Sequence, residues 1–150
     1  MAEGIFSEIR VLDFTQYLAG PSCTRLMAEM GADVIKVEMP PIGDMSRVLP
    51  WLIDGRSGYF VQQNRGKRSL FVDVKRPEGR DLLRELIPLV DVLVENFSPG
   101  VIDRLGFGWD VVSKLNPRLV MCSISAFGQQ GPLADQPGYD GIAQAYAGVL

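Results

Sequence analysis

The sequence predicts an α/β protein in which helices cover both faces of a doubly wound parallel sheet. Two observations indicate this fold class. Short runs rich in β-branched and apolar residues alternate with stretches of helical periodicity. The helices between successive strands are long enough for right-handed crossovers, which make neighbouring strands parallel. The chain has 150 residues, of which 47% are hydrophobic and 22% charged, a composition ordinary for one folded domain with a buried core.

Five strands are expected along the chain, each followed by a turn or a helical stretch. They cover residues 9–14 (IRVLDF), 33–38 (DVIKVE), 67–74 (KRSLFVDV), 90–96 (VDVLVEN) and 119–124 (LVMCSI). Their β-branched and apolar content distinguishes these short runs from the helical segments between them.

Helices are expected between the strands and after the last one. Pro21 opens the first helix and Gly31 ends it, and Pro77 opens the second. The other helical patterns are residues 101–105, residues 110–115 and a run that begins near Tyr139 and still continues at Leu150. Residues 39–58 carry three prolines and three glycines, so we expect a long surface connection there, of a length that usually serves a function.

Composition disfavours several classes of function. The net charge of −3 is not offset by any long basic block, which makes nucleic acid a poor partner. No apolar run approaches the roughly 20 residues of a membrane span and no secretory pattern is present, so we expect a cytoplasmic protein. The absence of histidine excludes a histidine base or metal ligand within this chain. Cys23 and Cys122, far apart in sequence, are expected to be small core residues without a disulfide.

The strand at residues 90–96 ends by presenting an amide, an aromatic ring and a hydroxyl before Pro99 (VENFSPG). Ligands of doubly wound sheets bind at the carboxyl ends of the strands, where loops meet helix amino termini. We therefore expect Asn96, Phe97 and Ser98 to face a ligand. The loop after the first strand, TQYLAGP, lacks the G-x-G-x-x-G spacing that brings a backbone close to a dinucleotide pyrophosphate, which disfavours an NAD dehydrogenase.

Six stretches resemble the amino-terminal part of one enzyme family. They are VLDFTQYLAGP, GADVIKVE, NRGKRSL, PEGRDLL, VENFSPGVIDRLG and NPRLVMCSISAFGQQGP, in order along the chain. The chain resembles family III CoA-transferases, which include formyl-CoA transferase, carnitine CoA-transferase and α-methylacyl-CoA racemase. The resemblance implies that residues 1–150 form the first, coenzyme A-binding part of a Rossmann-like large domain. The rest of that domain and a small domain would lie outside this chain, and the whole protein would form an interlocked homodimer.

The same resemblance implies a binding site for coenzyme A and no metal. The residues it points to are Leu18, Ala19, Val72, Asp73, Val74, Lys75, Asn96, Phe97, Ser98, Arg104 and Tyr139. The segment 72–75 and the turn 96–98 would line the adenosine end, where a ring can add roughly 1 to 3 kcal/mol of stacking. Arg104 would approach the phosphates, which suit its planar fork of donors. Met39 departs from the pattern, because some relatives have an arginine near the nucleotide there.

Several of these residues also have a plain structural interpretation. Phe97 fits a hydrophobic core as well as an adenine platform, and Lys75 and Arg104 fit solvated surface charges. Asp140 is most simply the first residue of a helix, where a carboxylate interacts favourably with the helix dipole. Residues 64–68 (NRGKR) fit a charged turn as well as a functional loop.

The implied reaction moves coenzyme A from an acyl-CoA donor to a carboxylic acid acceptor. Transferase relatives use an aspartate that attacks the donor thioester, forms an anhydride and then carries coenzyme A as a thioester; this aspartate is expected beyond Leu150. Racemase relatives need a histidine directly before the position of Asp140. Tyr139 stands there instead, and an ordinary phenol, which titrates at about pH 10, is a poor base at neutral pH. A racemase and a noncatalytic nucleotide-binding or assembly module are the alternatives.

Overall fold

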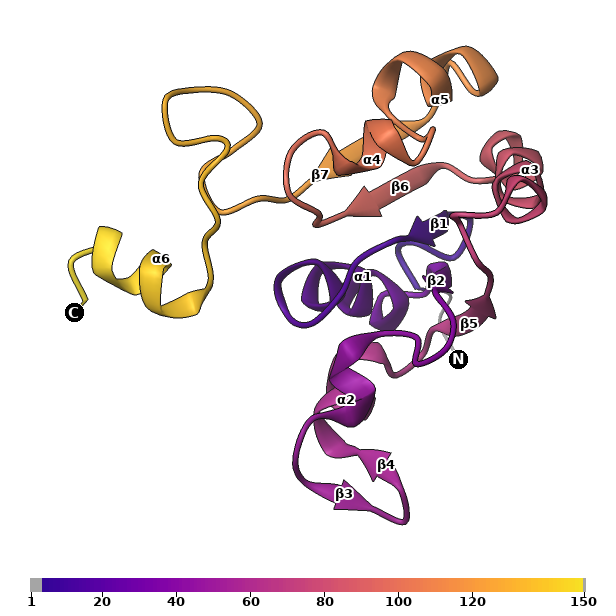
Figure 1. Ribbon diagram of the computed structural model, residues 1–150. Coiled ribbons are helices and arrows are strands. Elements are labelled where there is room, and N and C mark those ends of the chain that lie inside the picture. Colours follow the sequence, from indigo (N-terminus) through magenta and orange to yellow (C-terminus); the bar gives the residue numbers. More distant parts are fainter. Residues whose placement is uncertain (1–3, 150) are drawn as a thin grey trace.

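A parallel sheet of five strands forms the core of the computed structural model, which describes residues 4–149 (Figure 1). The strands are β1 (Arg10–Asp13), β2 (Asp33–Glu38), β5 (Arg68–Phe71), β6 (Val92–Glu95) and β7 (Val120–Ser123). Their spatial order is β5-β2-β1-β6-β7, and every neighbouring pair is parallel. Counted along the chain, this is the order 3-2-1-4-5 of a Rossmann-like, doubly wound sheet. The predicted fold class is confirmed.

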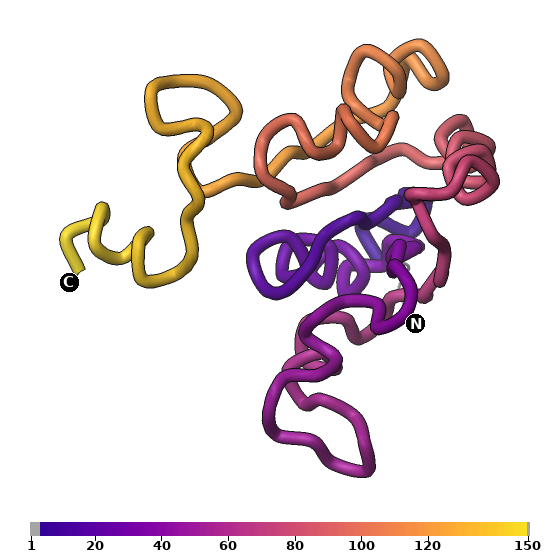
Figure 2. Tube along the Cα trace, in the orientation of Figure 1, coloured from indigo at the N-terminus to yellow at the C-terminus, as the bar shows by residue number. Residues whose placement is uncertain are grey.

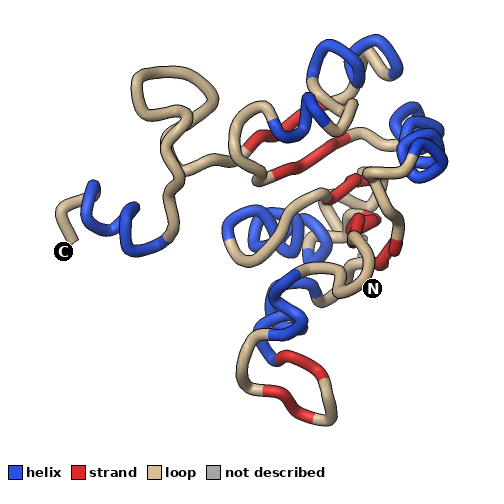
Figure 3. Tube along the Cα trace, in the orientation of Figure 1, coloured by secondary structure: helices blue, strands red, loops and turns tan. Residues whose placement is uncertain are grey.

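Helices lie on both faces of this sheet (Figure 3). They are α1 (Ala19–Glu29), α2 (Gly58–Asn64), α3 (Pro77–Leu86), α4 (Val101–Arg104), α5 (Trp109–Leu115) and α6 (Asp140–Tyr146), with short 3-10 helices η1 (Met45–Val48) and η2 (Ile87–Leu89). The chain moves from β1 to β2 through α1, and then crosses back past β1 to β6 through α3. α1 packs in the cluster of Val11 and α3 in the cluster of Leu12, so the two helices cover opposite faces, as right-handed crossovers require.

Two hydrophobic clusters fill the space between the sheet and these helices. Val11 belongs to a smaller cluster, to which α1 contributes. Leu12, the next residue, belongs to a larger cluster that Leu83 of α3, Ile102 of α4 and Val112 of α5 complete. Both Val11 and Leu12 are fully buried. The central strand is thus covered on its two faces, as the parallel sheet requires.

The connection after β2 contains more regular structure than its sequence predicts. It includes η1 and a small antiparallel hairpin of β3 (Leu52–Ile53) and β4 (Arg56–Ser57), which projects from the body of the molecule (Figures 1 and 2). The sequence pattern also gives no indication of α2, which follows the hairpin directly. Ser57 caps this helix, since its hydroxyl accepts a hydrogen bond from the backbone N–H of Phe60 at 3.4 Å.

Two predicted boundaries shift by a few residues. α1 begins at Ala19, so Pro21 is its third residue, within the first turn whose N–H groups have no helical partner. β5 ends at Phe71, three residues before the predicted end of the strand. The N–H of Val72 still donates to the carbonyl of Glu38 at 2.9 Å, and the chain then turns into α3.

The segment after β7 leads away from the sheet to α6 (Figures 1 and 2). α6 buries none of its residues, and Tyr146 packs edge-on against Phe127 of the same segment with ring centroids 5.1 Å apart. The prediction of a helix that continues to the end of the chain is wrong. α6 ends at Tyr146, and Gly148 has a φ of +74°, a left-handed conformation that favours glycine. Leu150 lies outside the described residues.

The two cysteines approach each other although 98 residues separate them in the sequence. Cys23 and Cys122 are both half-buried and not bonded to each other, and Cys122 packs against the smaller cluster. Burial, and then the proximity of Cys23 and of Glu95, raise the pKa of Cys122. None of the described helices is long and apolar enough to cross a membrane.

Candidate functional site

The candidate site begins where the strand order reverses, between β1 and β6. Figure 1 shows β6 pointing toward the side on which the chain runs out to α6. The loops after β1 and β6 both leave the sheet at this carboxyl edge, because the strands are parallel and in register at Asp13 and Val94. Such a reversal opens a crevice in doubly wound folds. Leu18 lies at the end of the first of these loops and Ala19 begins α1, while residues 96–98 lie in the second loop.

Asn96 ties the two loops together. Its Nδ2 donates to the carbonyl of Gln16 at 2.8 Å, and its Oδ1 accepts from the N–H of Gln16 at 2.7 Å. One side-chain amide therefore satisfies both backbone groups of a residue 80 positions earlier in the chain. The contribution of Asn96 is to position the loop after β1.

The turn after β6 is fixed by Glu95 and Gly100. The carboxylate of Glu95, which is buried, accepts from the N–H of Phe97 at 2.8 Å. Burial raises the pKa of Glu95, despite hydrogen bonds from Ser123 and Phe97 that favour the charged form. Gly100 adopts a φ of +77° directly before α4. The ring of Phe97 is half-buried and packs against the larger core cluster, so part of it remains at the surface, and Ser98 is exposed beside it.

The segment 72–75 divides between the core and the surface. Val72 and Val74 are core residues of the larger cluster, so their side chains are turned away from solvent and only their backbone can meet a ligand. Asp73 accepts a hydrogen bond from the N–H of Lys75 at 2.9 Å, which closes a tight turn. Lys75 itself is exposed and carries its charge at the surface.

A buried ion pair between Asp13 and Lys67 stabilises the start of the loop after β1. Their side chains are 0% and 1% exposed, and Lys67 Nζ lies 3.0 Å from Asp13 Oδ2. The same ammonium donates to Asn64 at 2.9 Å and to the carbonyl of Pro21 at 3.1 Å, and Thr24 donates to Asp13 at 2.6 Å. Burial lowers the pKa of Lys67, while the charge of Asp13 opposes that effect. Residues 64 and 67 of the NRGKR stretch therefore have a structural role.

A second buried pair, Lys36 and Asp44, holds the connection after β2. The two charged atoms are 2.9 Å apart, and Lys36 also donates to the carbonyl of Thr15 at 2.6 Å. Burial acts to raise the pKa of Asp44, but the charge and hydrogen bond of Lys36 and the hydrogen bonds of Ser46 outweigh it, so the pKa lies below its ordinary value. Asp44 also accepts from the N–H of Tyr17 at 3.3 Å. Lys36 and Asp44 thus connect β2, the loop after β1 and η1.

A third pair, Glu38 and Arg47, completes this network. Two guanidinium nitrogens of Arg47 lie 2.6 Å from the two carboxylate oxygens of Glu38, and Ser69 donates to the same carboxylate at 2.7 Å. Arg47 also lies over the ring of Phe60, 3.7 Å from its centroid. Burial acts to raise the pKa of Glu38, but the hydrogen bonds of Arg47, Asp44 and Ser69 lower it to about 2.

Asp13, Lys36 and Glu38 are not among the candidate residues that the sequence indicates. A signal was present, because each charge stands inside an otherwise apolar strand pattern, in VLDF and DVIKVE. A charged side chain in a strand that is covered on both faces must find a partner. Lys67 lies 54 positions from Asp13. Asp44 and Arg47 lie eight and nine positions from Lys36 and Glu38, in a connection without a periodic pattern, so the local sequence does not indicate the pairing.

Arg104 lies beside a basic cavity between α3 and α4. The cavity has a volume of about 250 Å³ and is lined by Pro77, Arg80, Asp81, Arg84, Arg104, Leu105 and Gly106. Arg104 is exposed at the end of α4, and a Cβ added to Gly100 would lie 3.1 Å from its Nη1. The guanidinium therefore lies over the end of the turn that contains Asn96, Phe97 and Ser98. Among residues 4–149, no group of three or more histidine, cysteine, aspartate or glutamate side chains could hold a metal ion.

The sequence model of CoA-transferase family III matches residues 6–150. The chain belongs to CoA-transferase family III. A formyl-CoA:oxalate CoA-transferase of Rhodopseudomonas palustris is 48% identical over 142 residues, which are 94% of this chain and 33% of that protein. An acyl-CoA transferase of Fusarium pseudograminearum is 42% identical over 160 positions, which cover 99% of this chain and 35% of that protein.

A solved structure of a family III relative supports the same assignment. The crystal structure of a CaiB/BaiF family protein from Brucella suis superposes with a TM-score of 0.92 at 38% identity, over 99% of this chain and 40% of the other. This chain spans about a third of the length of the curated relatives it matches.

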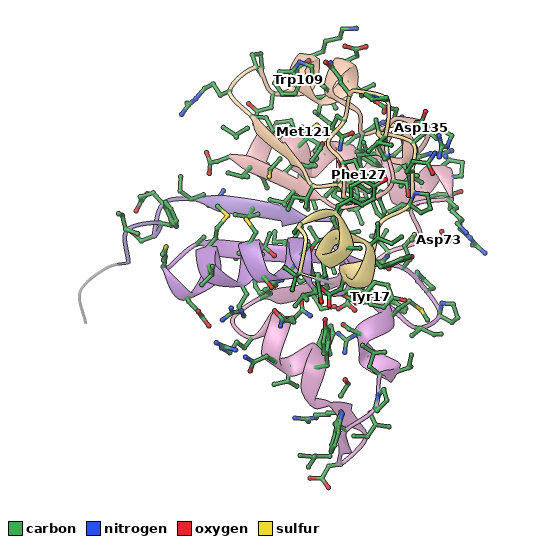
Figure 4. All side chains as sticks on the ribbon, turned by 90° about the vertical axis from the view of Figure 1, so that its left-hand side faces the viewer. Tyr17, Asp73, Trp109, Met121, Phe127 and Asp135 are labelled. Atoms are coloured by element: carbon green, nitrogen blue, oxygen red, sulfur yellow. The ribbon has the colours of Figure 1, made fainter. Side chains whose placement is uncertain are left out.

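Tyr139 and Asp140, the positions that distinguish activities within the family III resemblance, lie apart from the other candidate residues. Tyr139 is 77% exposed and precedes α6, and Asp140 is the first residue of that helix, as predicted. In the view of Figure 4, α6 lies in front of the sheet, with Tyr17 labelled at its lower edge. Burial, and then the negative charges of Asp44 and Asp140, raise the pKa of Tyr59. The structure thus brings Asp140 within electrostatic range of α2 but gives Tyr139 no buried partner.

Proposed function

We propose that this chain is the coenzyme A-binding first part of a CoA-transferase that moves coenzyme A between an acyl-CoA donor and a carboxylic acid acceptor. The observation that carries the proposal is the reversal of strand order between β1 and β6, where the double hydrogen bond between Asn96 and Gln16 joins the two loops at the carboxyl edge of the sheet. Family membership supports a CoA thioester as the ligand of this edge.

The proposed nucleotide site uses surface groups at the carboxyl edge of the sheet. The exposed part of the Phe97 ring offers a flat apolar surface to adenine, and the backbone of residues 72–75 lines the same edge. Lys75 and Arg104 are exposed cations that can meet phosphate oxygens. Leu18 and Ala19, at the start of α1, lie where the pantetheine arm would run toward the reacting groups. No metal takes part in this scheme.

The covalent step is assigned to an aspartate outside this chain. A carboxylate nucleophile would attack the thioester carbonyl and form an anhydride as the C–S bond breaks and CoA thiolate leaves; the thiolate would then return to the aspartyl carbonyl and release the acyl carboxylate. The acceptor carboxylate would take coenzyme A by the reverse sequence. The chain has no histidine, and Tyr139, which stands where racemase relatives need a histidine, is exposed to solvent. This favours a transferase over a racemase.

The test is mass spectrometry of the full-length protein after incubation with a panel of acyl-CoAs that includes formyl-CoA. Formyl-CoA and oxalate are the substrates named for several relatives, so they are the first pair to use. We expect an adduct of coenzyme A on one aspartate, detected intact, or the primary alcohol that remains at that position after borohydride has reduced the aspartyl thioester and released coenzyme A. A protein that shows no adduct and no transfer with any donor would contradict the proposal and favour a noncatalytic nucleotide-binding module.

A further inference from the structure

Two thiols lie on facing sides of the smaller hydrophobic cluster. Cys122 is the third residue of β7, and its side chain packs against this cluster, which contains Val11 and Val94. Met27 of α1 packs against the same cluster from the other side. Cys23 precedes Met27 by four positions in α1, which places the two side chains on one face of the helix. Cys23 is therefore on the face of α1 that covers the sheet.

The position of α1 along the sheet is fixed by a hydrogen bond next to Cys23. Thr24 donates to Asp13 of β1 at 2.6 Å. In the register of the sheet, Asp13 is opposite Val94, and Val94 is opposite Cys122. Asp13, Val94 and Cys122 thus form one row across three neighbouring strands, with their side chains on the face that α1 covers. Cys23 lies at the level of this row.

The two flanks of α1 face opposite edges of the sheet. Ala28 lies toward β5, because a Cβ added to Gly66, two residues before that strand, would lie 3.4 Å from the Cβ of Ala28. Cys23 precedes Ala28 by five positions, which turns its side chain by roughly 140° around the helix axis. Since the strand order is β5-β2-β1-β6-β7, the flank that carries Cys23 faces β6 and β7. The helix thus directs Cys23 toward the strand that carries Cys122.

The two thiols differ in their environment. Both are half-buried and not bonded to each other. Burial, and then the proximity of Cys23 and Glu95, raise the pKa of Cys122, so its thiol stays protonated at neutral pH and is a weak nucleophile. The first attack on an oxidant therefore falls to Cys23.

We propose that Cys23 and Cys122 are a modification site, at which a hydroperoxide converts the two thiols to a disulfide that ties α1 to β7. With hydrogen peroxide, the sulfur of Cys23 attacks one oxygen, the O–O bond breaks, and the departing hydroxide takes the thiol proton and leaves as water. The sulfur of Cys122 then attacks the resulting sulfenic acid. The S–S bond forms, the S–O bond breaks, and a second water leaves with the proton of Cys122. Peroxide is reduced, and the two thiols are oxidised.

The experiment treats the reduced full-length protein with hydrogen peroxide, blocks the remaining thiols with iodoacetamide and maps the peptides by mass spectrometry without reduction. We expect one linked pair of peptides that contain Cys23 and Cys122, and loss of both thiols to alkylation. Dithiothreitol should separate the pair and restore both thiols. The linked pair should form in the folded protein and not depend on unfolding by urea.

Two variants test the order of the steps with dimedone, which traps sulfenic acids. Cys122→Ala leaves Cys23 without its partner, so a dimedone adduct should accumulate on Cys23. Cys23→Ala should leave Cys122 as a free thiol without an adduct. An adduct on Cys122 in the second variant would overturn the assignment of the first attack to Cys23.

The wild type alone decides whether the bond forms. Free thiols at both positions after peroxide treatment, or separate oxidation of each sulfur to a sulfinic acid without a linked pair, would overturn the proposal. A linked pair that forms only in urea would overturn it as well, because the folded arrangement of α1 and β7 would then have no part in the reaction. The proposal does not depend on the proposed function.

Discussion

Asn96 shows how one side chain can shape a binding site without touching its ligand. The sequence predicts its place at the end of a buried strand, because VDVLVEN breaks off into turn-forming residues. The sequence does not predict its partner, since Gln16 is 80 residues away and the hydrogen bonds involve its backbone groups, which every residue type except proline has. Both polar atoms of the amide are used within the protein, and the loop after β1 depends on them.

Substitution of Asn96 should therefore weaken both the fold and ligand binding. Asn96→Ala removes both hydrogen bonds to Gln16 and should cost about 1 to 3 kcal/mol of stability, since the half-buried backbone groups lose their partners. Asn96→Asp keeps an acceptor for the N–H of Gln16 but places a carboxylate oxygen against the carbonyl of Gln16, so it should cost at least as much. Chemical denaturation and coenzyme A titration of the two variants measure these effects. Equal stability of Asn96→Ala and wild type would contradict the positioning role.

The charged residues inside β1 and β2 form buried ion pairs. Asp13, Lys36 and Glu38 interrupt apolar runs, and the structure pairs each with an opposite charge. Burying such charges is costly, so each pair stabilises the fold only while both members are present. Their visible effect is to fix the loops at the carboxyl edge of the sheet.

Lys67→Met should destabilise the protein by about 3 to 5 kcal/mol, because it leaves the buried carboxylate of Asp13 without a cation. The double variant Asp13→Asn/Lys67→Met should recover part of this loss. Arg68→Met is the matched control, since Arg68 and its partner Asp33 are 65% and 41% exposed, and exposed pairs contribute about 0 to 1 kcal/mol. Urea denaturation measures the free energy of unfolding of both variants. An equal decrease in Lys67→Met and Arg68→Met would show that the buried pair contributes no more to stability than the exposed pair.

At the scale of elements, the strands and the longer helices are predictable and the connections are not. β1, β2, β6, β7, α1 and α3 carry several apolar residues at one period, and tertiary packing agrees with that local pattern. α2 has only seven residues, and η1 forms where Asp44 and Arg47 pair with Lys36 and Glu38 of β2, so side-chain contacts rather than apolar periodicity accompany these short helices. α6 ends early because Gly148 leaves the helical conformation, although the apolar pattern continues through Val149.

The connection after β2 should loosen at low pH. The pKa of Glu38 falls from 4.5 to about 2 in the folded protein. A carboxyl with a depressed folded pKa contributes stability that is present above its unfolded pKa and is lost as the pH falls through the folded value. The contribution of Glu38 should therefore be complete above about pH 4.5 and disappear toward pH 2, and a shift of this size corresponds to roughly 3 kcal/mol.

The comparison of wild type with Glu38→Gln isolates this contribution from that of other carboxyl groups. The difference in unfolding free energy between the two proteins should be largest at neutral pH and shrink between pH 4.5 and 2. Denaturant titrations across this range provide the measurement. A difference that stays constant with pH would mean that the ion pair with Arg47 does not lower the pKa as the geometry implies.

At the scale of the whole molecule, large apolar side chains remain without cover. Trp51 and Ile53 of the β3–β4 hairpin are 86% and 73% exposed, and Tyr146 and Val149 near the end of the chain are 67% and 70% exposed. Exposed apolar groups of this size commonly mark contact surfaces. We propose that later parts of the longer protein and the second subunit of an interlocked homodimer cover them.

Residues 1–150 produced alone should therefore associate and show no transfer activity. The exposed hairpin and α6 would drive association, and the proposed aspartate nucleophile would be absent. Light scattering on the purified chain and an assay of transfer between carboxylic acids check the two parts. A monomeric chain that transfers coenzyme A would contradict both, and would make Asp140 the first candidate for the nucleophile.

The most direct test of the account follows the full-length protein in D₂O, with formyl-CoA and oxalate in one reaction and with a branched acyl-CoA and other carboxylates in a second. Mass spectrometry of the products reports both new thioesters and deuterium at the α-carbon of a branched acyl-CoA. The account predicts that coenzyme A appears on the acceptor acid and that the α-carbon gains no deuterium. Deuterium uptake without any transfer would contradict the account and identify the racemase alternative.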